Sequence, residues 1–425
     1  MKNTQNDTRS VSSCDKKKKY NDIDSVITFE NYNKALKACK HGVMWKASPQ
    51  KYCYTPISNM YETLQIVSQG VIPELTNVNP ITLYERGKER TIIPIAFNDR
   101  ITQRVICDNS LIPLVRPTLI NDNGASTKNK GVSFTRDRLD KFMRKMVNEY
   151  GEDFYILIFD FKSFFNSIPH QTCYDALMKL YDDPQIVDLI MQVVKSYMRP
   201  NLEKIEDAEI RKRELDKLEN NQQRGICLGS EISQILALLV PNAVDHYIKD
   251  TCGIKYYIRY MDDGVLLHHD KEVLHQVYNG AKEVCDRLGL KFNDKKTHIV
   301  KASKGFTFLK IQYRVSGRKV IKTLSRSSIT RMRRKLKKYR KLVDNGEMSL
   351  DDVYNSLQSW IGHAKIAKSY HTVKSMLKLY DELFDGYRIT KRYEHLTKGG
   401  KDNGKVLQNN LCSEFRWDSD IAVTS

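Results

Sequence analysis

Three aspartates stand where apolar, β-like runs of the sequence give way to polar residues. Asp160 ends the unbroken apolar run at residues 154–159, and Asp262 and Asp263 separate two further β-like runs. Mg²⁺ prefers oxygen ligands and keeps several of its waters, so a few carboxylates at the ends of adjacent strands can bind it. Transfer of a nucleotide to a 3′ hydroxyl needs two such ions about 3.5–4 Å apart. The three aspartates therefore predict a two-metal nucleotidyl-transfer site.

Two other aspartate pairs in the chain allow a comparison. The pairs at 182–183 and 351–352 lie at predicted helix starts, where acids cap the backbone and suit the helix dipole. The pair at 262–263 instead interrupts two apolar β runs at a turn, where an ordinary hairpin would have glycine or asparagine. We interpret the pair at 262–263 as catalytic and the other two as structural.

The positive charge of the chain is concentrated in one segment. The formal net charge is +19, and residues 301–343 contain sixteen Lys or Arg and no Asp or Glu. Clustered cations gain affinity for phosphates because binding releases the counterions of a nucleic acid. We therefore expect a nucleic acid to bind there. The alternative, a solvated basic face, suits shorter charge runs better.

The composition argues against several other classes of protein. The nine cysteines are scattered and form no CxxC pair, so neither a zinc site nor a redox dithiol is indicated. The sequence contains no signal peptide and no apolar run of about eighteen residues that could span a membrane. It therefore predicts a soluble, cytoplasmic protein without a membrane partner.

The apolar pattern predicts an α+β chain. Helical stretches alternate with short β runs to about residue 146, a buried strand leads to Asp160, and a tight hairpin presents the pair at 262–263. From residue 327 the pattern is helical, with one apolar stripe and cations on the other faces.

Five segments, in their order along the chain, resemble the palm motifs of reverse transcriptases. They are FDFKSFFNSI (159–168), LGSEISQ (228–234), YMDD (260–263), LGLKFNDKKT (288–297) and GFTFLKIQY (305–313). Upstream, GKERTIIPIAFNDRITQRVI (87–106) resembles the fingers of bacterial reverse transcriptases. The resemblance covers about residues 80–375.

Together with the composition, this resemblance implies the right-hand polymerase fold, in five parts. They are a flexible basic arm at 1–25, fingers at 26–150, a palm with an antiparallel sheet at 151–315, a helical basic thumb at 316–397 and a C-terminal tail at 398–425.

The resemblance also assigns catalytic roles. The carboxylates of Asp160, Asp262 and Asp263 and the backbone carbonyl of Phe161 would hold two Mg²⁺ ions, with Mn²⁺ as the alternative ion. Lys296, preferred over Lys295, would protonate the pyrophosphate leaving group.

Two further sets of residues would contact the substrates. The nucleotide-binding set is Lys88, Arg90, Phe165, Gly229 and Gln234, in which Phe165 is an aromatic gate that rejects a 2′ hydroxyl. A core position is the alternative for Phe165. The nucleic-acid-binding set is Arg331, Arg333, Arg334, Lys335, Lys337 and Lys338.

The chain departs from common reverse transcriptases at three positions. Leu228 stands where glutamine is frequent, Gln234 where proline is frequent, and Lys310 where the primer-grip hairpin often has glycine. Leu228 and Gln234 resemble the SQ variant, which is typical of diversity-generating retroelement enzymes and of several bacterial defence-associated reverse transcriptases. The chain also resembles group II intron reverse transcriptases.

These resemblances imply an RNA-directed DNA polymerase that makes cDNA from a structured non-coding RNA in bacterial antiphage defence. Its partners would be that RNA template, the cDNA product and deoxynucleotides, with the oligomeric state left open. The alternatives are a diversity-generating retroelement reverse transcriptase, a template-independent DNA polymerase and a non-catalytic RNA-binding scaffold.

Overall fold

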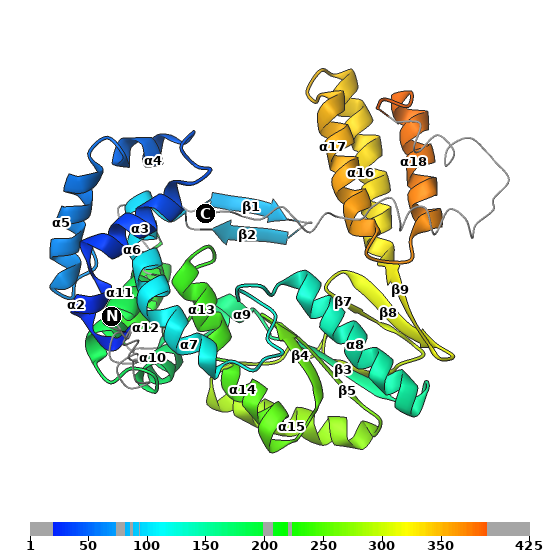
Figure 1. Cartoon of the computed structure of the whole chain (residues 1–425), viewed down its shortest axis with the longest axis horizontal. Helices are drawn as coiled ribbons and strands as arrows, with labels where there is room; N and C mark the ends of the chain where they lie inside the picture. The colour runs from blue at the N-terminus through cyan, green and yellow to red at the C-terminus, as the bar shows by residue number, and fades with distance from the viewer. Residues whose placement is uncertain are drawn as a thin grey trace, which may run out of the picture. The chain divides into compact units, whose positions relative to one another are not determined.

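The computed structural model describes residues 20–73, 81–85, 88–92, 94–198, 207–219 and 223–388. The chain forms two compact units. Unit 1 comprises Met1–Met146 and Phe154–Ile299, and unit 2 comprises Val147–Asp153 and Val300–Ser425. Figure 1 labels most of the helices and strands of both units.

Helices form the first part of unit 1. The backbone N–H of Ser25 donates to the side chain of Asp22, which caps α2, and Ile23 and Val26 of that helix are buried. The segment predicted as a flexible arm is therefore folded in its last residues, while residues 1–19 lie outside the described residues. The elements are α2 (Ile23–Val26), α3 (Phe29–Lys40), α4 (Ala47–Tyr52), α5 (Pro56–Ser68), α6 (Phe97–Ile106), the π-helical turn η1 (Cys107–Leu111), α7 (Ile112–Val115), the 3₁₀ turn η2 (Arg116–Thr118) and α8 (Val132–Tyr150), whose last four residues belong to unit 2.

A two-stranded antiparallel hairpin precedes α6. Its strands are β1 (Ile81–Glu85) and β2 (Lys88–Ile92), and the register pairs Ile81 with Ile92 and Glu85 with Lys88. The hairpin contains the predicted fingers cations.

A four-stranded sheet of order β4-β5-β3-β6 carries the aspartates. Its strands are β3 (Tyr155–Asp160), β4 (Tyr256–Tyr260), β5 (Asp263–His268) and β6 (His298–Lys301), and β5 is antiparallel to both β3 and β4. The ring of Phe159 lies against Gly264, its cross-strand partner, where an added Cβ would come within 2.2 Å of Phe159 Cζ. Only glycine can therefore follow Asp263 without moving that ring.

The remaining helices of unit 1 complete its core. Ser230 caps α13 by accepting from the backbone N–H of Ser233, and α15 packs against β3 and β5. The elements are α9 (Phe164–Ser167), α10 (His170–Met178), α11 (Pro184–Met198), α12 (Ala208–Glu219), α13 (Glu231–Leu239), α14 (Asn242–His246), the π-helical turn η4 (Tyr247–Thr251) and α15 (Lys271–Arg287).

Unit 2 contains a three-stranded sheet and a helical bundle. The sheet has the order β7-β8-β9, with β7 (Phe306–Phe308), β8 (Ile311–Ser316) and β9 (Lys319–Leu324). The helices are α16 (Arg326–Asp344), α17 (Leu350–Ala364) and α18 (Tyr370–Phe384). Their buried side chains, among them Leu336, Leu357 and Tyr380, form a core of their own.

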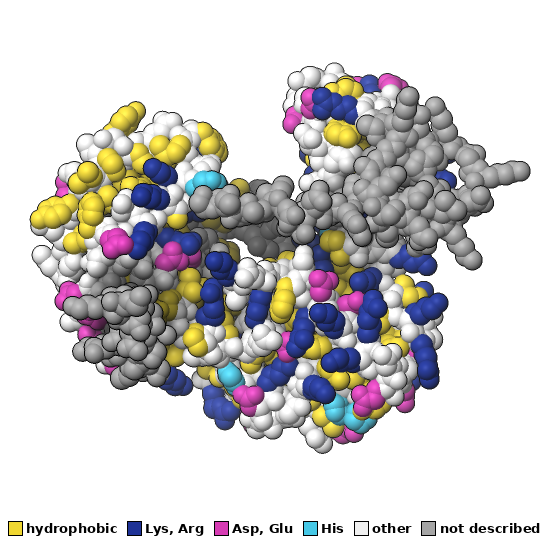
Figure 2. Space-filling view, viewed as in Figure 1, with side chains coloured by type: hydrophobic (Ala, Val, Ile, Leu, Met, Phe, Trp, Pro, Cys, Tyr) yellow, Lys and Arg dark blue, Asp and Glu magenta, His cyan; other side chains and the backbone are white. Residues whose placement is uncertain are grey.

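The mixture of helices with antiparallel sheets confirms the predicted α+β class. The described surface also exposes apolar groups: Figure 2 shows hydrophobic side chains gathered over α4 and α5, where Tyr54 and Ile57 are among the most exposed. None of the described helices is long and apolar enough to cross a membrane.

Candidate active site

Strand pairing brings the three aspartates together. Asp160 lies opposite Asp263 in the register of β3 and β5, and Asp262 lies in the two-residue turn between β4 and β5. The backbone N–H of Phe161 donates to the Asp262 carbonyl at 3.2 Å, which ties this turn to the chain that leaves β3. One carboxylate oxygen from each aspartate lies within 4.8 Å of the others.

This donor set fits a hard divalent cation. Among the described residues, it is the one group of three or more His, Cys, Asp or Glu side chains close enough together to hold an ion. All of its donors are carboxylate oxygens, the ligands that Mg²⁺ and Mn²⁺ prefer.

The electrostatics of the cluster also favour a bound cation. Burial is the largest cause that raises the pKa of Asp263 from 3.8 to about 7, and the neighbouring Asp262 and Asp160 add to the shift while Lys296 opposes it. The positive charge of Lys296 therefore balances the negative charge of the three carboxylates only in part. A divalent cation would supply the missing positive charge and favour ionised Asp263.

Among the described residues, Lys296 forms an ion pair with Asp160. Its Nζ lies 2.5 Å from Asp160 Oδ2. Partial burial lowers the pKa of Lys296, but the hydrogen bond to Asp160 and the charges of the three aspartates more than offset this, so the net shift is upward. The ammonium group therefore carries its proton at neutral pH.

Asn293 holds Asp160 and the Lys296 loop in one arrangement. Its backbone N–H donates to the Asp160 carbonyl at 2.7 Å, and its Nδ2 donates to Asp160 Oδ1 at 3.2 Å. The backbone N–H of Lys296 in turn donates to the Asn293 carbonyl at 2.9 Å. Sequence reasoning missed this residue, although it lies inside the segment at 288–297 that resembles a palm motif.

A buried ion pair supports the turn that carries Asp262. Arg259 and Asp245 are both fully buried, and Arg259 Nη2 lies 2.6 Å from Asp245 Oδ2. Arg259 Nη1 donates to the carbonyl of Met261 at 2.9 Å, and the Tyr257 hydroxyl donates to Asp245 Oδ1 at 2.6 Å. Arg259 thus links the turn to α14.

The turn itself has an unusual backbone conformation. Met261 has φ 52°, in the left-handed region that residues other than Gly, Asn and Asp rarely adopt. Such conformations persist when the surrounding structure enforces them. The hydrogen bond from Arg259 and the strands on both sides provide that enforcement.

The three phenylalanines after Asp160 take different positions. Phe161 is buried and stacks on Phe292 with ring centroids 5.2 Å apart, so only its backbone can contribute to the metal site. Phe164 is also buried. Phe165 is half-buried and meets Phe164 edge to face at 5.6 Å. Of the three, Phe165 is therefore the one whose ring is open to a ligand.

The other predicted nucleotide-binding residues lie in two elements. Gly229 has φ 105°, which favours glycine, in the turn before α13. Gln234 is exposed, and its Oε1 accepts from Ser126 Oγ at 3.3 Å. Lys88 and Arg90 belong to β2, and their side chains lie outside the described part of the chain.

The six predicted nucleic-acid-binding cations share one helix of unit 2. α16 buries Met332 and Leu336 in the bundle core and leaves the six cations exposed. Arg333 Nη2 donates to Ser375 Oγ at 3.1 Å, and Lys335 Nζ donates to Ser356 Oγ at 3.1 Å. The exposed cations are Arg331, Arg333, Arg334, Lys335, Lys337 and Lys338.

The carboxylate cluster at this hairpin turn, contacted by a protonated lysine, could hold a divalent cation. The family model described as reverse transcriptase (RNA-dependent DNA polymerase) matches residues 79–313, more than half of the chain. The chain belongs to this family. No curated protein matches the sequence.

Two solved telomerase structures are among those to which the chain is similar. The chain is similar to telomerase from Candida albicans in complex with a fragment of telomeric RNA, with 13% identity, a TM-score of 0.43 and coverage of 85% of this chain and 63% of that one. It is also similar to apo telomerase from Candida tropicalis truncated from its C-terminal domain, with 13% identity, a TM-score of 0.41 and coverage of 63% and 60%. The chain spans less than two thirds of each of these telomerase chains.

Proposed function

We propose that this protein is an RNA-directed DNA polymerase that works by two-metal nucleotidyl transfer. The observation that carries the proposal is the cluster of Asp160, Asp262 and Asp263, whose oxygens lie within 4.8 Å of one another inside the segment that the family model matches. Two Mg²⁺ ions, or Mn²⁺, held by these carboxylates and the Phe161 carbonyl, would activate the 3′ hydroxyl and hold the triphosphate.

The chain's own residues would orient the nucleotide and supply a proton. Lys296 carries its proton at neutral pH and donates it to the leaving pyrophosphate. The half-buried ring of Phe165 would reject a ribose 2′ hydroxyl. Lys88 and Arg90 neutralise the triphosphate, since positive groups aimed at the transferring phosphoryl oxygens stabilise the transition state.

Gly229 and Gln234 would contact the nascent base pair and the nucleotide. The left-handed backbone of Gly229 supports this role, because a residue without a side chain lets the backbone approach a ligand closely. The exposed cations of α16 would contact phosphates of the template–product duplex.

The proposed parts are those of a right hand. Fingers occupy 26–150, the palm 151–315 and the basic thumb 316–397, between a basic arm at 1–25 and a tail at 398–425. Residues 389–425 lie outside the described part of the chain.

The proposed biological role is bacterial antiphage defence in the cytoplasm, with a structured non-coding RNA as template. The support is the SQ variant at 228–234, which resembles defence-associated and diversity-generating lineages. A diversity-generating role would require an accessory protein, and a scaffold would have no need of three clustered carboxylates.

The proposal is tested on protein purified with its bound RNA. Mg²⁺ and labelled deoxynucleotides are added, the products are treated with RNase or DNase, and product and bound RNA are both sequenced. We expect DNA complementary to one co-purified structured RNA. DNA unrelated to any bound RNA would contradict templated synthesis, and the absence of DNA would contradict the polymerase.

A further inference from the structure

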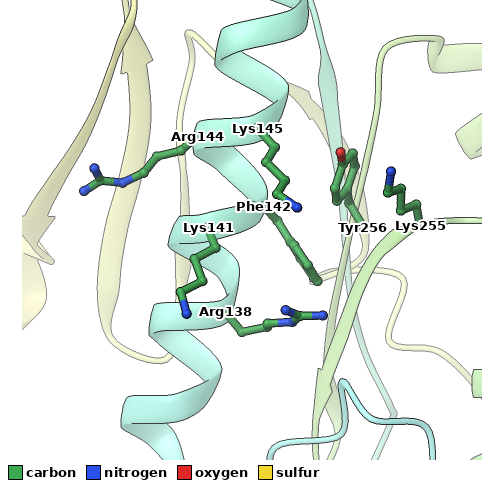
Figure 3. Close-up of a pocket in the computed structure, with 7 residues that line it drawn as sticks. All are labelled: Arg138, Lys141, Phe142, Arg144, Lys145, Lys255 and Tyr256. Atoms are coloured by element: carbon green, nitrogen blue, oxygen red, sulfur yellow. The ribbon is translucent and has the colours of Figure 1, made fainter.

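A basic hollow lies between α8 and the edge strand β4, and no residue of the candidate active site lines it. Its volume is ≈ 330 Å³. Figure 3 shows Arg138, Phe142 and Lys145 reaching it from α8 and Lys255 and Tyr256 lying on the other side. Lys141 also lines it. Figure 2 shows Lys and Arg side chains gathered over α8.

The three lysines that line the hollow are exposed and can meet an anion. Arg138 lies 2.6 Å from Asp122, and Arg144, which points away from the hollow in Figure 3, lies 2.9 Å from Asp140. Lys141, Lys145 and Lys255 are exposed, and no carboxylate of the described residues lines the hollow. The hollow therefore presents uncompensated positive charge.

Most of the cations that line the hollow lie on one stretch of α8. Lys141 and Lys145 are four residues apart on α8, where like charges repel. Arg138 precedes Lys141 by three residues, so the same face carries a third cation. Asp137 lies four residues before Lys141 and Glu149 four residues after Lys145, so α8 also carries acids. None of these acids lines the hollow, and the cations that do line it favour a polyanionic partner there.

The floor of the hollow is aromatic. The Phe142 and Tyr256 rings lie 5.4 Å apart at 55°, with Phe142 only 4% exposed and Tyr256 half-buried. Lys255 Nζ lies 5.6 Å from the centroid of the Tyr256 ring, and Lys145 extends toward the space between the two rings in Figure 3. Aromatic surfaces beside cations that track a phosphate backbone are the arrangement that binds unpaired bases.

We propose that this hollow binds a single-stranded segment of nucleic acid, with one base against Tyr256 and the adjacent phosphates on Lys141, Lys145 and Lys255. The partner is single-stranded because a base must leave its stack to enter a hollow of this size. The choice of nucleic acid over an acidic protein rests on the proposed polymerase function, and it matches the charge and the aromatic floor. The site would hold part of the bound RNA, or the product strand, outside the catalytic cluster.

The test measures the binding of a labelled, unstructured 20-nucleotide RNA and of the same DNA sequence by fluorescence anisotropy, over a range of salt. The full-length K141A/K145A variant is compared with K37A/K40A, which removes two exposed lysines of α3 and so makes the same change in net charge. On a single strand, each phosphate contact contributes about 0.7 to the magnitude of the slope of log K against log salt concentration. We therefore expect this slope to be about 1.4 smaller in magnitude for K141A/K145A than for wild type. This corresponds to roughly tenfold weaker binding at about 0.15 M salt. K37A/K40A should retain the wild-type slope.

A second variant tests the aromatic part of the site. Tyr256→Leu keeps the apolar bulk and removes the ring, and we expect about fivefold weaker binding, the low end of base stacking, because Lys255 already covers part of the ring. If RNA binds more tightly than DNA, the occupant of the hollow is a segment of the bound RNA. If DNA binds more tightly, the occupant is the product strand. Equal affinities and equal salt slopes for K141A/K145A and K37A/K40A would overturn the proposal.

The binding assay contains EDTA and no deoxynucleotides, so its result does not depend on catalysis. A failure of DNA synthesis would leave the binding result intact, and a failure of binding at the hollow would leave the polymerase proposal intact.

Discussion

The buried Arg259–Asp245 pair offers a prediction that separates stability from positioning. Arg259→Met removes a guanidinium that contacts Asp245, the carbonyl of Met261 and, at 3.1 Å, the carbonyl of Leu238. Asp245 is then left fully buried, with the Tyr257 hydroxyl as its remaining described side-chain donor. Removing one partner of a buried pair costs about 3–5 kcal/mol, so we expect a loss of this size in the free energy of unfolding.

The double variant R259M/D245L removes the unpaired charge. Replacing both partners of a buried pair with apolar residues is often close to neutral, so most of the lost stability should return, less about 1 kcal/mol for the unpaired Tyr257 hydroxyl. The double variant still lacks the hydrogen bond that Arg259 donates to the Met261 carbonyl in wild type. The turn that carries Asp262 would therefore lack its anchor in a protein that is otherwise folded.

Urea denaturation and steady-state primer extension measure the two effects. We expect the double variant to unfold near the wild-type urea concentration but to show a kcat lower by about 10²-fold, the effect of a small misplacement of catalytic groups. KM for the deoxynucleotide should change less, because the fingers and Phe165 are untouched. Wild-type kcat in the stable double variant would refute a positioning role for Arg259.

Three further predictions follow from the geometry of the cluster. Phe165→Val should increase the incorporation of ribonucleotides relative to deoxynucleotides in competition assays, whereas unchanged sugar selectivity would place the gate elsewhere. Lys296→Met should lower kcat by about 10²-fold or more, the usual contribution of a general acid, and the exposed Lys295→Met control should stay near wild type; equal effects of the two would argue against the proton donor. The pKa of Asp263 is raised from 3.8 to about 7 in the folded chain, so in metal-free protein its contribution to stability is present below pH 3.8 and is lost as pH rises toward 7. Because a bound cation requires the ionised carboxyl, the rise in Tm on adding Mn²⁺ should grow from pH 6 to pH 8, and Asp263→Asn, measured by differential scanning fluorimetry, should remove most of that pH dependence.

The cluster of aspartates could be predicted because its signal is local. An apolar run that ends in Asp160 and a turn at 262–263 place carboxylates at strand ends, and antiparallel pairing then brings them side by side. The aromatic segment after Asp160 could not be resolved in the same way. Only packing shows that Phe161 and Phe164 are buried and that Phe165 remains half-exposed.

The supporting residues could not be predicted, because their partners are distant or unexpected. Arg259 lies in an apolar β run and Asp245 in a helix, and burying both charges is favourable only once the fold pairs them. Asn293 reaches Asp160 across more than 130 residues of sequence. Lys141 and Lys145 likewise line the same hollow as Lys255, which is far away in the sequence. No periodic pattern in the sequence predicts that these residues come together.

An alternating pattern at 306–321, with a turn signal at Ser316–Gly317, predicts one hairpin. The structure pairs β8 with β9 around that turn and adds the short strand β7. β9 pairs with β8 through Ser316 and Lys319, and it contains Lys322, whose carbonyl accepts from the backbone N–H of Lys368 at 2.9 Å. The additional strand β7 has only three residues, too few for an alternating pattern to separate it from β8.

The most direct test of the central claim is DNA synthesis by variants of the aspartate pairs. Primer extension on a defined RNA template with Mg²⁺ compares wild type, D262N/D263N and D182N/D183N, the last of which makes the same change at a pair outside the cluster. We predict labelled DNA, resistant to RNase and degraded by DNase, from wild type and from D182N/D183N, and none from D262N/D263N. Equal yields from all three proteins, or no DNA from wild type, would contradict the account.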